Sequence, residues 1–342
     1  MKISTIGLDI AKNVFQVHGV DEAGAIVVRK QLRRSQVVTF FAKLPPCLVG
    51  IEACATAHHW SRALAALGHE VRLMPAGYVK AYVKRNKNDA ADAQAICEAV
   101  GRPTMRFVAS KSKEQQSVLM VHKARQLLVR QRTMLGNAMR GHLAEFGLTA
   151  RRGRQGLATL LAIVRDEDDG RLPTIARLSL IALAQQYEAV QVQIADLERH
   201  LHAWHRTNET SRRLAEVPGI GPLVATALVA SVSDPTVFTC GRGLAAWIGL
   251  VPKEISSGGK QRLGPISKQG NRYLRWLLVS GAMAVIRYDK KTGFKKRPWL
   301  ARLLEHRPIK VAAVALANRI ARIAWVILAR GERYQEPRAL AA

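Results

Sequence analysis

The sequence has little cysteine and no long uncharged hydrophobic run. Its four cysteines form no Cys-x-x-Cys pair and lie at no zinc-ligand spacing from a histidine, which argues against a zinc site or a disulfide framework. That pattern suits a reducing cytoplasm, and the first residues lack a signal-peptide layout. The most apolar late stretch, residues 311–329, contains one asparagine and two arginines. It therefore predicts a buried or partner-facing helix and no membrane span.

Acidic residues are also scarce: 25 Asp and Glu oppose 53 Lys and Arg, for a net charge of +28. The last 102 residues hold 21 of the basic residues and only 5 acidic ones. Because the 342 residues are 48% hydrophobic and 23% charged, the chain is expected to fold into two or three domains. The basic excess favours a nucleic-acid partner over a membrane-surface or purely colloidal role.

The first hundred residues alternate short apolar runs with helical patterns. The turn sequence at 21–24 separates two of these runs, and Pro45-Pro46 ends a helix that Ser35 is expected to cap. The expected strands are 3–10, 13–20, 25–29, 47–52 and 70–74, and the expected helices are 35–44, 58–67 and 89–100. The order β-β-β-α-β-α-β-α predicts a mixed sheet flanked by helices.

Four acids of this region fall where a metal site would need them. Asp9 and Glu52 lie near the ends of two apolar strands, where an unpaired buried carboxylate would be costly. Asp89 and Asp92 share one face at the start of a helix, although the helix dipole alone would also favour acids there. Carboxylates from separate elements bind Mg²⁺ in phosphoryl-transfer sites, so we expect the four to form a metal site.

Histidines and basic residues flank these acids. His58 and His59 follow Glu52 closely and are expected to begin a helix beside the site and not to bind metal. A basic approach that suits a nucleic-acid substrate is formed by Lys80, Lys84, Arg85 and Lys87.

The middle of the chain predicts a long helical arm. No proline interrupts residues 113–146, and an acidic run follows at 166–169. A 3.5-residue apolar period, typical of a coiled-coil seam, recurs at Leu183, Tyr187, Val190, Ile194, Leu197, Leu201 and Trp204. Two such helices can pair within one chain or between chains, and a structural or oligomerising role is sufficient for this region.

The last third contains two motifs that suit a phosphate backbone. Residues 214–228 resemble a helix-hairpin-helix element whose turn, Gly219-Ile220-Gly221, would present backbone amides to a phosphate. A plain helix-turn-helix connection is the alternative. Further on, basic residues of the loop 290–297 alternate with aromatic ones, a pattern that suits backbone contact with some stacking; the aromatic residues of this region are Tyr273, Trp276, Phe294 and Trp299.

The other motif that suits a phosphate backbone is the stretch 252–271. In it, Ser256 and Ser257 directly precede Gly258 and Gly259. Glycines allow the backbone to approach a ligand closely, and a serine held there is placed to contact or attack a phosphodiester. A flexible basic hairpin that clamps a backbone without chemistry is the alternative. The expected phosphate contacts are Lys253, Lys260, Arg262, Lys268, Arg272 and Arg275.

Taken in order, these motifs resemble those of transposases of insertion-sequence family 110, in its 1111 subgroup. The resemblance covers nearly the whole chain, and its motifs are specific in their order and spacing. They are Gly7–Lys12 (GLDIAK), Ile51–Ala53 (IEA), Asp89–Asp92 (DAAD), Pro218–Pro222 (PGIGP), Gly249–Pro252 (GLVP), Ser256–Lys260 (SSGGK) and Gly270–Arg275 (GNRYLR).

The resemblance implies three regions and a composite site. They are an α/β RNase H/RuvC-like domain (1–108), a coiled-coil helical arm (109–206) and a mostly α C-terminal transposase domain (207–342) with the helix-hairpin-helix-like element. Asp9, Glu52, Asp89 and Asp92 would bind Mg²⁺, and Ser257 would be the nucleophile, with Ser256 as its close competitor. Acids and serine would come from different subunits of a tetramer.

The resemblance further implies an RNA-guided DNA recombinase in the bacterial cytoplasm, associated with the nucleoid. Its partners would be donor and target DNA, a noncoding guide RNA from its own element and further copies of itself, as a dimer or tetramer. Two rival hypotheses remain. A metal-only nuclease, resembling a Holliday-junction resolvase, would cut without a protein–DNA adduct, and a non-catalytic scaffold would tolerate loss of Asp9 or Glu52.

Overall fold

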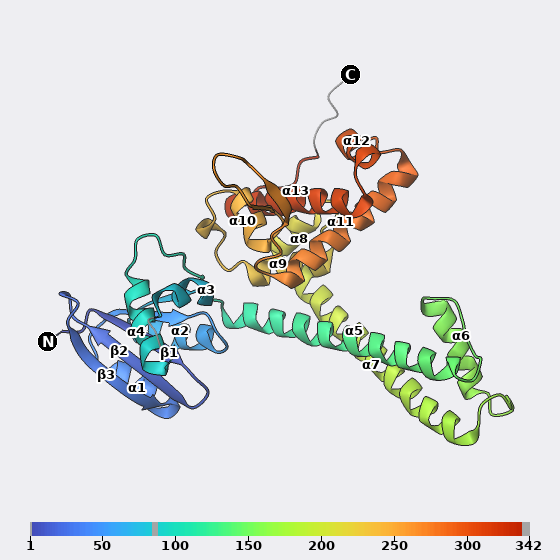
Figure 1. Ribbon diagram of the computed structural model, residues 1–342, viewed down its shortest axis with the longest axis horizontal. Helices are drawn as coiled ribbons and strands as arrows, with labels where there is room; N and C mark the ends of the chain where they lie inside the picture. Colours follow the sequence, from blue (N-terminus) through green and yellow to red (C-terminus); the bar gives the residue numbers. More distant parts are fainter. Residues whose placement is uncertain (1, 84–87, 337–342) are drawn as a thin grey trace. The chain divides into compact units, whose positions relative to one another are not determined.

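A computed structural model describes residues 2–83 and 88–336. The chain forms two compact units. The N-terminal unit comprises Met1–Gln115 with Ser231–Thr239, and the C-terminal unit comprises Gln116–Ala230 with Cys240–Ala342. The first is a mixed α/β region with a sheet, and the second is largely helical (Figure 1).

The N-terminal unit is built on a five-stranded sheet in the order β3-β2-β1-β4-β5. The first three strands are antiparallel neighbours, and β4 and β5 are added in parallel to β1. The strands are β1 (Thr5–Ile10), β2 (Val14–Val20), β3 (Ile26–Arg33), β4 (Leu48–Glu52) and β5 (Glu70–Met74), and the helices are η1 (Arg34–Gln36), α1 (Val37–Ala42), α2 (Ala57–Ala65), α3 (Ala76–Val79), η2 (Lys80–Tyr82) and α4 (Asp89–Val100). The mixed sheet expected from the sequence is confirmed.

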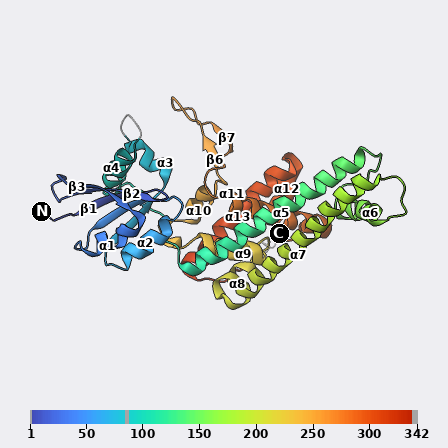
Figure 2. The same ribbon diagram turned by 90° about the horizontal axis from the view of Figure 1, so that it is seen from below.

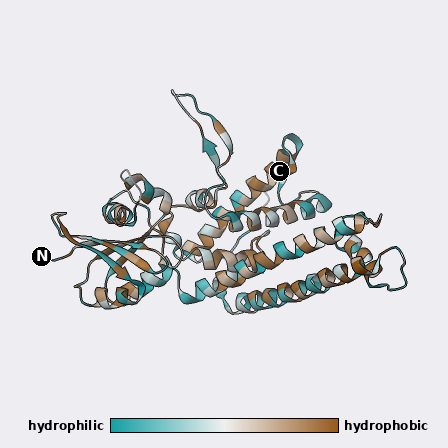
Figure 3. Cartoon of the chain, turned by 60° about the horizontal axis from the view of Figure 1, so that its bottom comes forward, coloured by the Kyte–Doolittle hydropathy of each residue, from teal (hydrophilic) through white to brown (hydrophobic). Residues whose placement is uncertain are grey.

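Alternating side chains of the central strands pack against helices on both faces of this sheet. Ile6 and Leu8 of β1 are fully buried in one core with Phe41 of α1 and Leu64 of α2. Helix α4 contacts β1, β2 and β4 and forms a second core with Met74. Figure 3 shows the hydrophobic colour concentrated along these strands. The sheet is therefore covered by α1 and α2 on one face and by α4 on the other.

Two local expectations are wrong here. Ser35 does not cap α1, because it lies inside the short 3-10 helix η1, and the residue that precedes α1, Gln36, makes no side-chain cap hydrogen bond to it. Strand β3 also extends to Arg33, four residues beyond its predicted end, because its backbone pairs with β2 along the whole length. Pairing with a neighbouring strand here outweighs the polar composition of the extension.

The arm consists of α5 (Lys113–Ala144), α6 (Arg154–Arg165) and α7 (Thr174–Thr207). The two long helices run antiparallel within one chain, since Arg125 of α5 pairs with Glu198 of α7 at 2.5 Å. Of the seven residues in the predicted apolar period, Tyr187, Val190, Ile194 and Leu201 are buried, and the other three are half-buried. Helix α6 was not predicted, yet its apolar face joins the same core through Leu157, Leu160, Leu161 and Val164.

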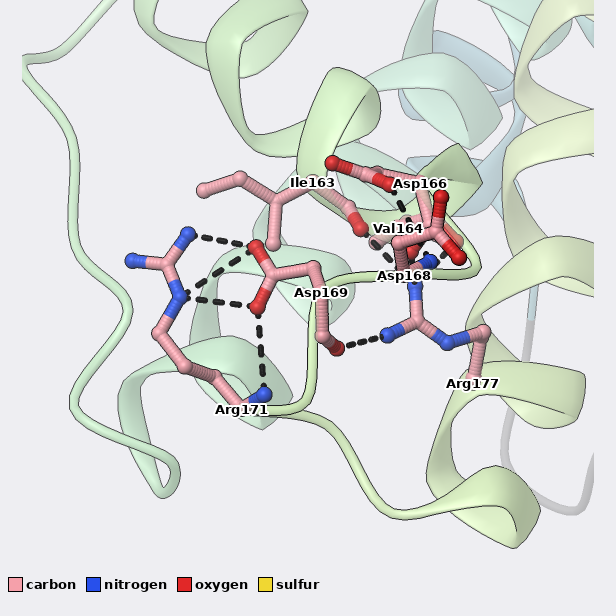
Figure 4. Close-up of polar contacts among 7 residues, drawn as sticks. All are labelled: Ile163, Val164, Asp166, Asp168, Asp169, Arg171 and Arg177. Carbon is pink, nitrogen blue, oxygen red and sulfur yellow. Dashed lines mark hydrogen bonds and ion pairs between the residues drawn. The ribbon is translucent and has the colours of Figure 1, made fainter.

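The acidic run at the far end of the arm is held by a buried arginine (Figure 4). Arg177 donates hydrogen bonds to the carbonyl oxygens of Ile163, Val164, Asp166 and Asp169. These carbonyls end α6 and begin the loop, so one guanidinium satisfies acceptors that the helix end leaves unpaired. Asp169 also pairs with Arg171. The acids 166–169 therefore form an ordered loop that closes the arm.

The rest of the C-terminal unit packs around α13 (Ile309–Arg330). Its other elements are α8 (Glu209–Ala215), α9 (Pro222–Ser231), α10 (Gly241–Ile248), β6 (Pro252–Glu254), β7 (Leu263–Ile266), α11 (Arg272–Thr292) and α12 (Pro298–His306); η3 (Pro235–Val237) belongs to the N-terminal unit. By length and composition α13 is able to cross a membrane, but Leu316, Ile320 and Ile327 are buried against its neighbours. It forms a core helix of the unit.

Candidate functional site

Three of the four predicted carboxylates lie together in the N-terminal unit. Side-chain oxygens of Asp9, Asp89 and Asp92 are all within 4.8 Å of one another. Asp9 comes from β1, and the other two come from the first turn of α4, where Asn88 caps the helix by accepting a hydrogen bond from the Ala91 amide. Over the part of the chain that the structure describes, this group contains these three carboxylates and neither histidine nor cysteine.

The cluster forms because α4 packs directly on two glycines of the sheet. Gly7 of β1 and Gly50 of β4 are register partners on adjacent parallel strands. A Cβ added at Gly7 would lie 2.1 Å from the Ala93 carbonyl oxygen and 2.4 Å from the Cys97 nitrogen, and one at Gly50 would lie 2.7 Å from Val100 Cβ. Only glycine allows the helix backbone this close, so the acids at its start reach the end of β1.

Glu52, the fourth predicted acid, ends β4 on the strand beside Asp9. The register pairs Leu8 with Ile51, so Asp9 and Glu52 are the next residue on each strand. Its carboxylate does not belong to the group whose oxygens lie within 4.8 Å. It is still close enough for its charge to raise the pKa of Asp9. The structure thus brings three acids together and places the fourth on the neighbouring strand.

The electrostatics of this cluster are unfavourable without a cation. Burial first, and then the charges of Asp92, Asp89 and Glu52, raise the pKa of Asp9 from 3.8 to about 6. The nearby thiol of Cys54 has its pKa raised by burial and then by Glu52 and Asp9. Cys54 was not singled out from the sequence, because a lone cysteine carries no spacing signal. Carboxylate oxygens are the hard ligands that a divalent cation such as Mg²⁺ prefers. A bound cation would also offset the repulsion that raises the pKa of Asp9.

The flanking residues fall into two groups. His58 accepts a hydrogen bond from the Lys111 amide at 3.2 Å, and His59 packs edge-on against Trp60, so both serve the packing of α2. Lys80 is exposed in η2. The other three members of the predicted basic approach, Lys84, Arg85 and Lys87, lie outside the described residues.

The serine stretch of the C-terminal unit forms an exposed hairpin between β6 and β7 (Figure 2). Gly258 and Gly259 have φ values of 55° and 75°, and Ser257 and Lys260 are bridged on either side of them. Two central residues with positive φ make the tight hairpin turn that follows the twist of its strands. Added Cβ atoms at both glycines would meet no atom within 4 Å. The tip is therefore open on all sides.

The two serines differ in what their hydroxyls contact. Ser256 donates a hydrogen bond to Glu254 Oε1 at 3.1 Å and accepts one from the Arg262 amide at 3.2 Å. Ser257 contributes its backbone carbonyl, which accepts from the Lys260 amide at 3.1 Å. The Ser256 hydroxyl therefore helps to join the two strands of the hairpin.

The base of the hairpin is fixed to the helices below it. Asn271 caps α11 by accepting hydrogen bonds from two amides of its first turn. Arg275, expected to contact phosphate, donates to the carbonyls of Ile248 and Gln269 at 2.6 and 2.8 Å. The other predicted phosphate contacts here are exposed: Lys253, Lys260, Arg262, Lys268 and Arg272.

The helix-hairpin-helix-like motif predicted at 214–228 contains a turn between α8 and α9. Gly219 has a φ of 96°, and its carbonyl oxygen lies so close to Gly281 of α11 that a Cβ there would be 2.0 Å away. At Gly221, an added Cβ would meet nothing within 4 Å. One glycine of the turn is thus required by packing, and the other lies beside open space.

Comparison with known proteins places both sites in one family. A model described as the transposase IS116/IS110/IS902 family matches residues 211–296, and a transposase model named for the DEDD motif of IS110 matches residues 6–147. A probable family 20 transposase of Pseudomonas aeruginosa is 51% identical over 98% of this chain and 99% of its own.

Two further relatives agree. The transposase for insertion sequence element IS1111A of Coxiella burnetii is 43% identical over 97% of this chain and 92% of its own. The transposase for element IS1328 of Yersinia enterocolitica is 37% identical over 96% and 98%. The protein therefore belongs to the IS116/IS110/IS902 family and is a transposase.

Proposed function

We propose that this transposase is an RNA-guided DNA recombinase that cuts and rejoins donor and target DNA through a phosphoserine–DNA intermediate. The observation that carries the proposal is the carboxylate cluster of Asp9, Asp89 and Asp92 in a DEDD-type family. The exposed Ser-Ser-Gly-Gly turn of the other unit supplies a candidate nucleophile.

We further infer that the N-terminal unit has an RNase H/RuvC-like fold. Three antiparallel strands are followed by two parallel ones, with α4 across the parallel pair, and the acids come from β1, β4 and the start of α4. Ligands in open α/β sheets bind beyond the carboxyl ends of the strands, which is where Asp9 and Glu52 lie.

Asp9, Asp89 and Asp92 would hold the metal, and Glu52 would complete the set. Oxygens sharing one octahedral Mg²⁺ shell lie about 3–4 Å apart, so a separation of at most 4.8 Å needs little adjustment. When bound, the cation would neutralise charge on the scissile phosphate and on the departing oxygen. The raised pKa of Asp9 supports this fit, because a nearby positive charge favours the ionised carboxylate.

Ser257 is our candidate nucleophile, with Ser256 as its competitor. Its Oγ would form a bond to the phosphorus, and the bond from phosphorus to the departing DNA oxygen would break. The serine proton would go to a base or to solvent, and the departing oxygen would take up a proton as a free hydroxyl. Attack by the hydroxyl of another strand would reverse these steps, so strands would be exchanged and resealed without ATP.

The nucleic-acid partners follow from charge as well as from family. The chain carries a net charge of +28, and exposed cations surround the serine turn. We propose that they contact the DNA backbone and a noncoding guide RNA from the same element. We also propose that the protein assembles as a dimer or tetramer and that its arm forms a coiled coil. The turn at 219–221 would bind nucleic acid, and the protein would act at the bacterial nucleoid.

The test is to trap the covalent intermediate. Purified protein would be incubated with Mg²⁺, the element's noncoding RNA and labelled DNA spanning the element junction, then denatured. Gel analysis would show whether DNA remains attached, and mass spectrometry would identify the modified residue. We expect an adduct on Ser257 that requires Asp9, Mg²⁺ and RNA.

Single-residue variants separate the alternatives. Ser257→Ala should abolish the adduct, whereas Ser256→Ala should retain it. An adduct that persists on Ser256 in the Ser257→Ala protein would move the assignment by one residue. Cleaved DNA without any adduct would identify a metal-only nuclease, and intact function in the Asp9→Asn protein would identify a scaffold. An adduct formed without RNA would show that this reaction needs no guide RNA.

A further inference from the structure

The C-terminal unit contains a cavity of about 400 Å³ that none of the steps above uses. It lies between the glycine turn that joins α8 to α9 and the second half of α11, from Gly281 to Tyr288, with the basic loop after it. Two motifs about 70 residues apart in sequence therefore form one hollow surface. A volume of this size lies in the range of small-ligand sites.

The floor of this cavity is apolar and rests on a close glycine contact. A Cβ added at Gly281 would lie 2.0 Å from the Gly219 carbonyl oxygen, and one added at Gly219 would lie 2.8 Å from Ile320 Cδ1. Val224 of α9 and Ala284 and Val285 of α11 line the space beside them. The floor is therefore apolar, which suits the face of a planar aromatic ring.

The rim of the cavity is aromatic and basic. Tyr288, on the last turns of α11, is 65% exposed. Lys296 is exposed and pairs at 2.9 Å with Glu336 from the segment after α13. Arg297 makes two 2.9 Å hydrogen bonds to the buried carboxylate of Asp289, which fixes the basic loop to the end of α11. The rim is thus built on a rigid support.

We propose that this cavity binds one unstacked nucleotide of a single strand, with its base on the floor beside Tyr288 and its phosphate at Lys296. The proposal rests on the proposed function, since it specifies how a nucleic-acid partner is held. Aromatic side chains stack on bases of any sequence, and a basic rim follows the phosphate backbone. The 65% exposed Tyr288 ring beside Lys296 supplies both elements.

Glu336 has a defined role in this arrangement. In the free protein its carboxylate pairs with the Lys296 ammonium, the group that the phosphate would contact. The carboxylate and the phosphate therefore compete for Lys296. A phosphate would replace one anionic partner with another, so Lys296 remains paired in both states. Glu336→Gln should therefore strengthen binding of single strands by about 2-fold, in line with the small effect of exposed ion pairs.

The test measures binding directly, without cleavage. Full-length protein would be titrated into fluorescently labelled single strands of about 16 nucleotides, in DNA and RNA forms, without Mg²⁺. Tyr288→Ala should weaken binding about 10-fold, whereas Tyr288→Phe, which keeps the ring, should bind as the wild type does. Ala284→Leu, an exposed helical position on the cavity wall, should also weaken binding by filling the floor.

Lys296→Gln tests the phosphate contact, and Lys295→Gln is its matched control. Both lysines are exposed in the same loop, but only Lys296 lines the cavity. Lys296→Gln should lower affinity and reduce the slope of log affinity against log salt by about 0.7, one phosphate contact. Lys295→Gln should leave that slope closer to the wild-type value.

Photocrosslinking locates the base. Single strands carrying 5-iodouracil would be irradiated with the protein, and mass spectrometry would identify the linked residue. We expect Tyr288, with the DNA and RNA forms showing which strand occupies the cavity. Unchanged affinity in both the Tyr288→Ala and Ala284→Leu proteins, or crosslinks only outside the cavity, would overturn the proposal. These binding measurements involve no cleavage and no Mg²⁺, so failure of the phosphoserine chemistry would not be mistaken for failure of this site.

Discussion

The carboxylates and the serines of this transposase are held in opposite ways. Asp9, Asp89 and Asp92 are gathered by a helix that sits in backbone contact with the sheet. Ser256 and Ser257 lie on an exposed turn, where a Cβ added at either of its two glycines would meet no atom within 4 Å. The acids depend on a helix that packs directly against the strand backbone, and the serines depend on a local turn at the exposed end of a hairpin.

This difference suggests a division of labour between the two regions. A metal site needs its ligands placed within a few tenths of an ångström, so a rigid sheet and helix suit the acids. An exposed turn can be positioned by the DNA that it binds, and binding then supplies the alignment that the free hairpin lacks. Variants in the two regions should therefore separate stability from activity, and the largest effects are expected on the acids.

Asp9→Asn should produce the largest loss. Removing a carboxylate from the proposed metal site should lower strand-transfer activity by about 1,000-fold, since losing one group that stabilises transition-state charge costs up to this much. The same change removes a desolvated charge among three acids, so the metal-free protein should become slightly more stable. Mg²⁺ should raise the melting temperature of the wild type and not of the variant.

Asp21→Asn provides the control for that experiment. Asp21 accepts two amide hydrogen bonds in an exposed turn of the same unit, which asparagine can also accept. Both activity and the Mg²⁺ effect on melting should stay as in the wild type. Equal loss in the Asp9 and Asp21 variants would contradict a metal role for Asp9.

Gly7→Ala tests whether packing of α4 creates the acid cluster. The added methyl would clash with the Ala93 carbonyl oxygen and push the helix away from β1. We expect a loss of about 3 kcal/mol in the free energy of unfolding, together with weaker Mg²⁺ binding. Gly77→Ala in helix α3, where a Cβ would meet no atom within 4 Å, should not lower the free energy of unfolding and should leave Mg²⁺ binding unchanged. Denaturant unfolding with and without Mg²⁺ measures both.

The sequence predicted the acids better than the packing that gathers them. The succession of strands and helices along the chain follows from apolar runs, and the carboxylate positions follow from acids at strand ends and at a helix start. The role of Gly7 and Gly50 does not, because it depends on which strands become neighbours and which helix crosses them. Helix α6 was missed for a similar reason: its 12 residues follow an Arg- and Gly-rich link that gave no helix-start signal.

The serine hairpin shows the opposite balance. A hairpin was one expectation for this stretch, since adjacent glycines favour a tight turn by themselves. The cavity beside Tyr288 could not be predicted, because the glycine turn and the basic loop meet only through packing on α11. Local chemistry is readable from sequence, whereas the meeting of distant segments requires the tertiary structure.

The support beneath the hairpin should respond to pH. His122 of α5 is 1% exposed, and its ring nitrogens lie 3.0 Å from the hydroxyls of Tyr273 in α11 and Thr226 in α9. Burial, and then the charge of Arg125, lower its pKa from 6.5 to about 4. The unfolded chain thus binds the proton more readily, so this contribution to stability is lost as pH falls from about 6.5 to 4.

The expected size is about 3 kcal/mol at most across that window. His122→Gln retains hydrogen-bonding capacity without titrating there, so its free energy of unfolding should depend less on pH between 6.5 and 4. Urea unfolding at several pH values, followed by a probe in the C-terminal unit, measures this. Identical pH slopes in the two proteins would show that His122 does not titrate as its burial requires.

Glu254→Gln should have the smallest effect, and it distinguishes the two serines. Glu254 is the only acid within residues 252–271 and accepts the hydrogen bond of the Ser256 hydroxyl. If Ser257 is the nucleophile, this bond only steadies the hairpin, glutamine can replace it, and adduct formation should change by less than about 3-fold. If Ser256 is the nucleophile and Glu254 its base, loss of the base should slow the adduct by about 100-fold or more. Global stability should be unchanged in both cases, because the hairpin is exposed, so the rate alone reports which hydroxyl reacts.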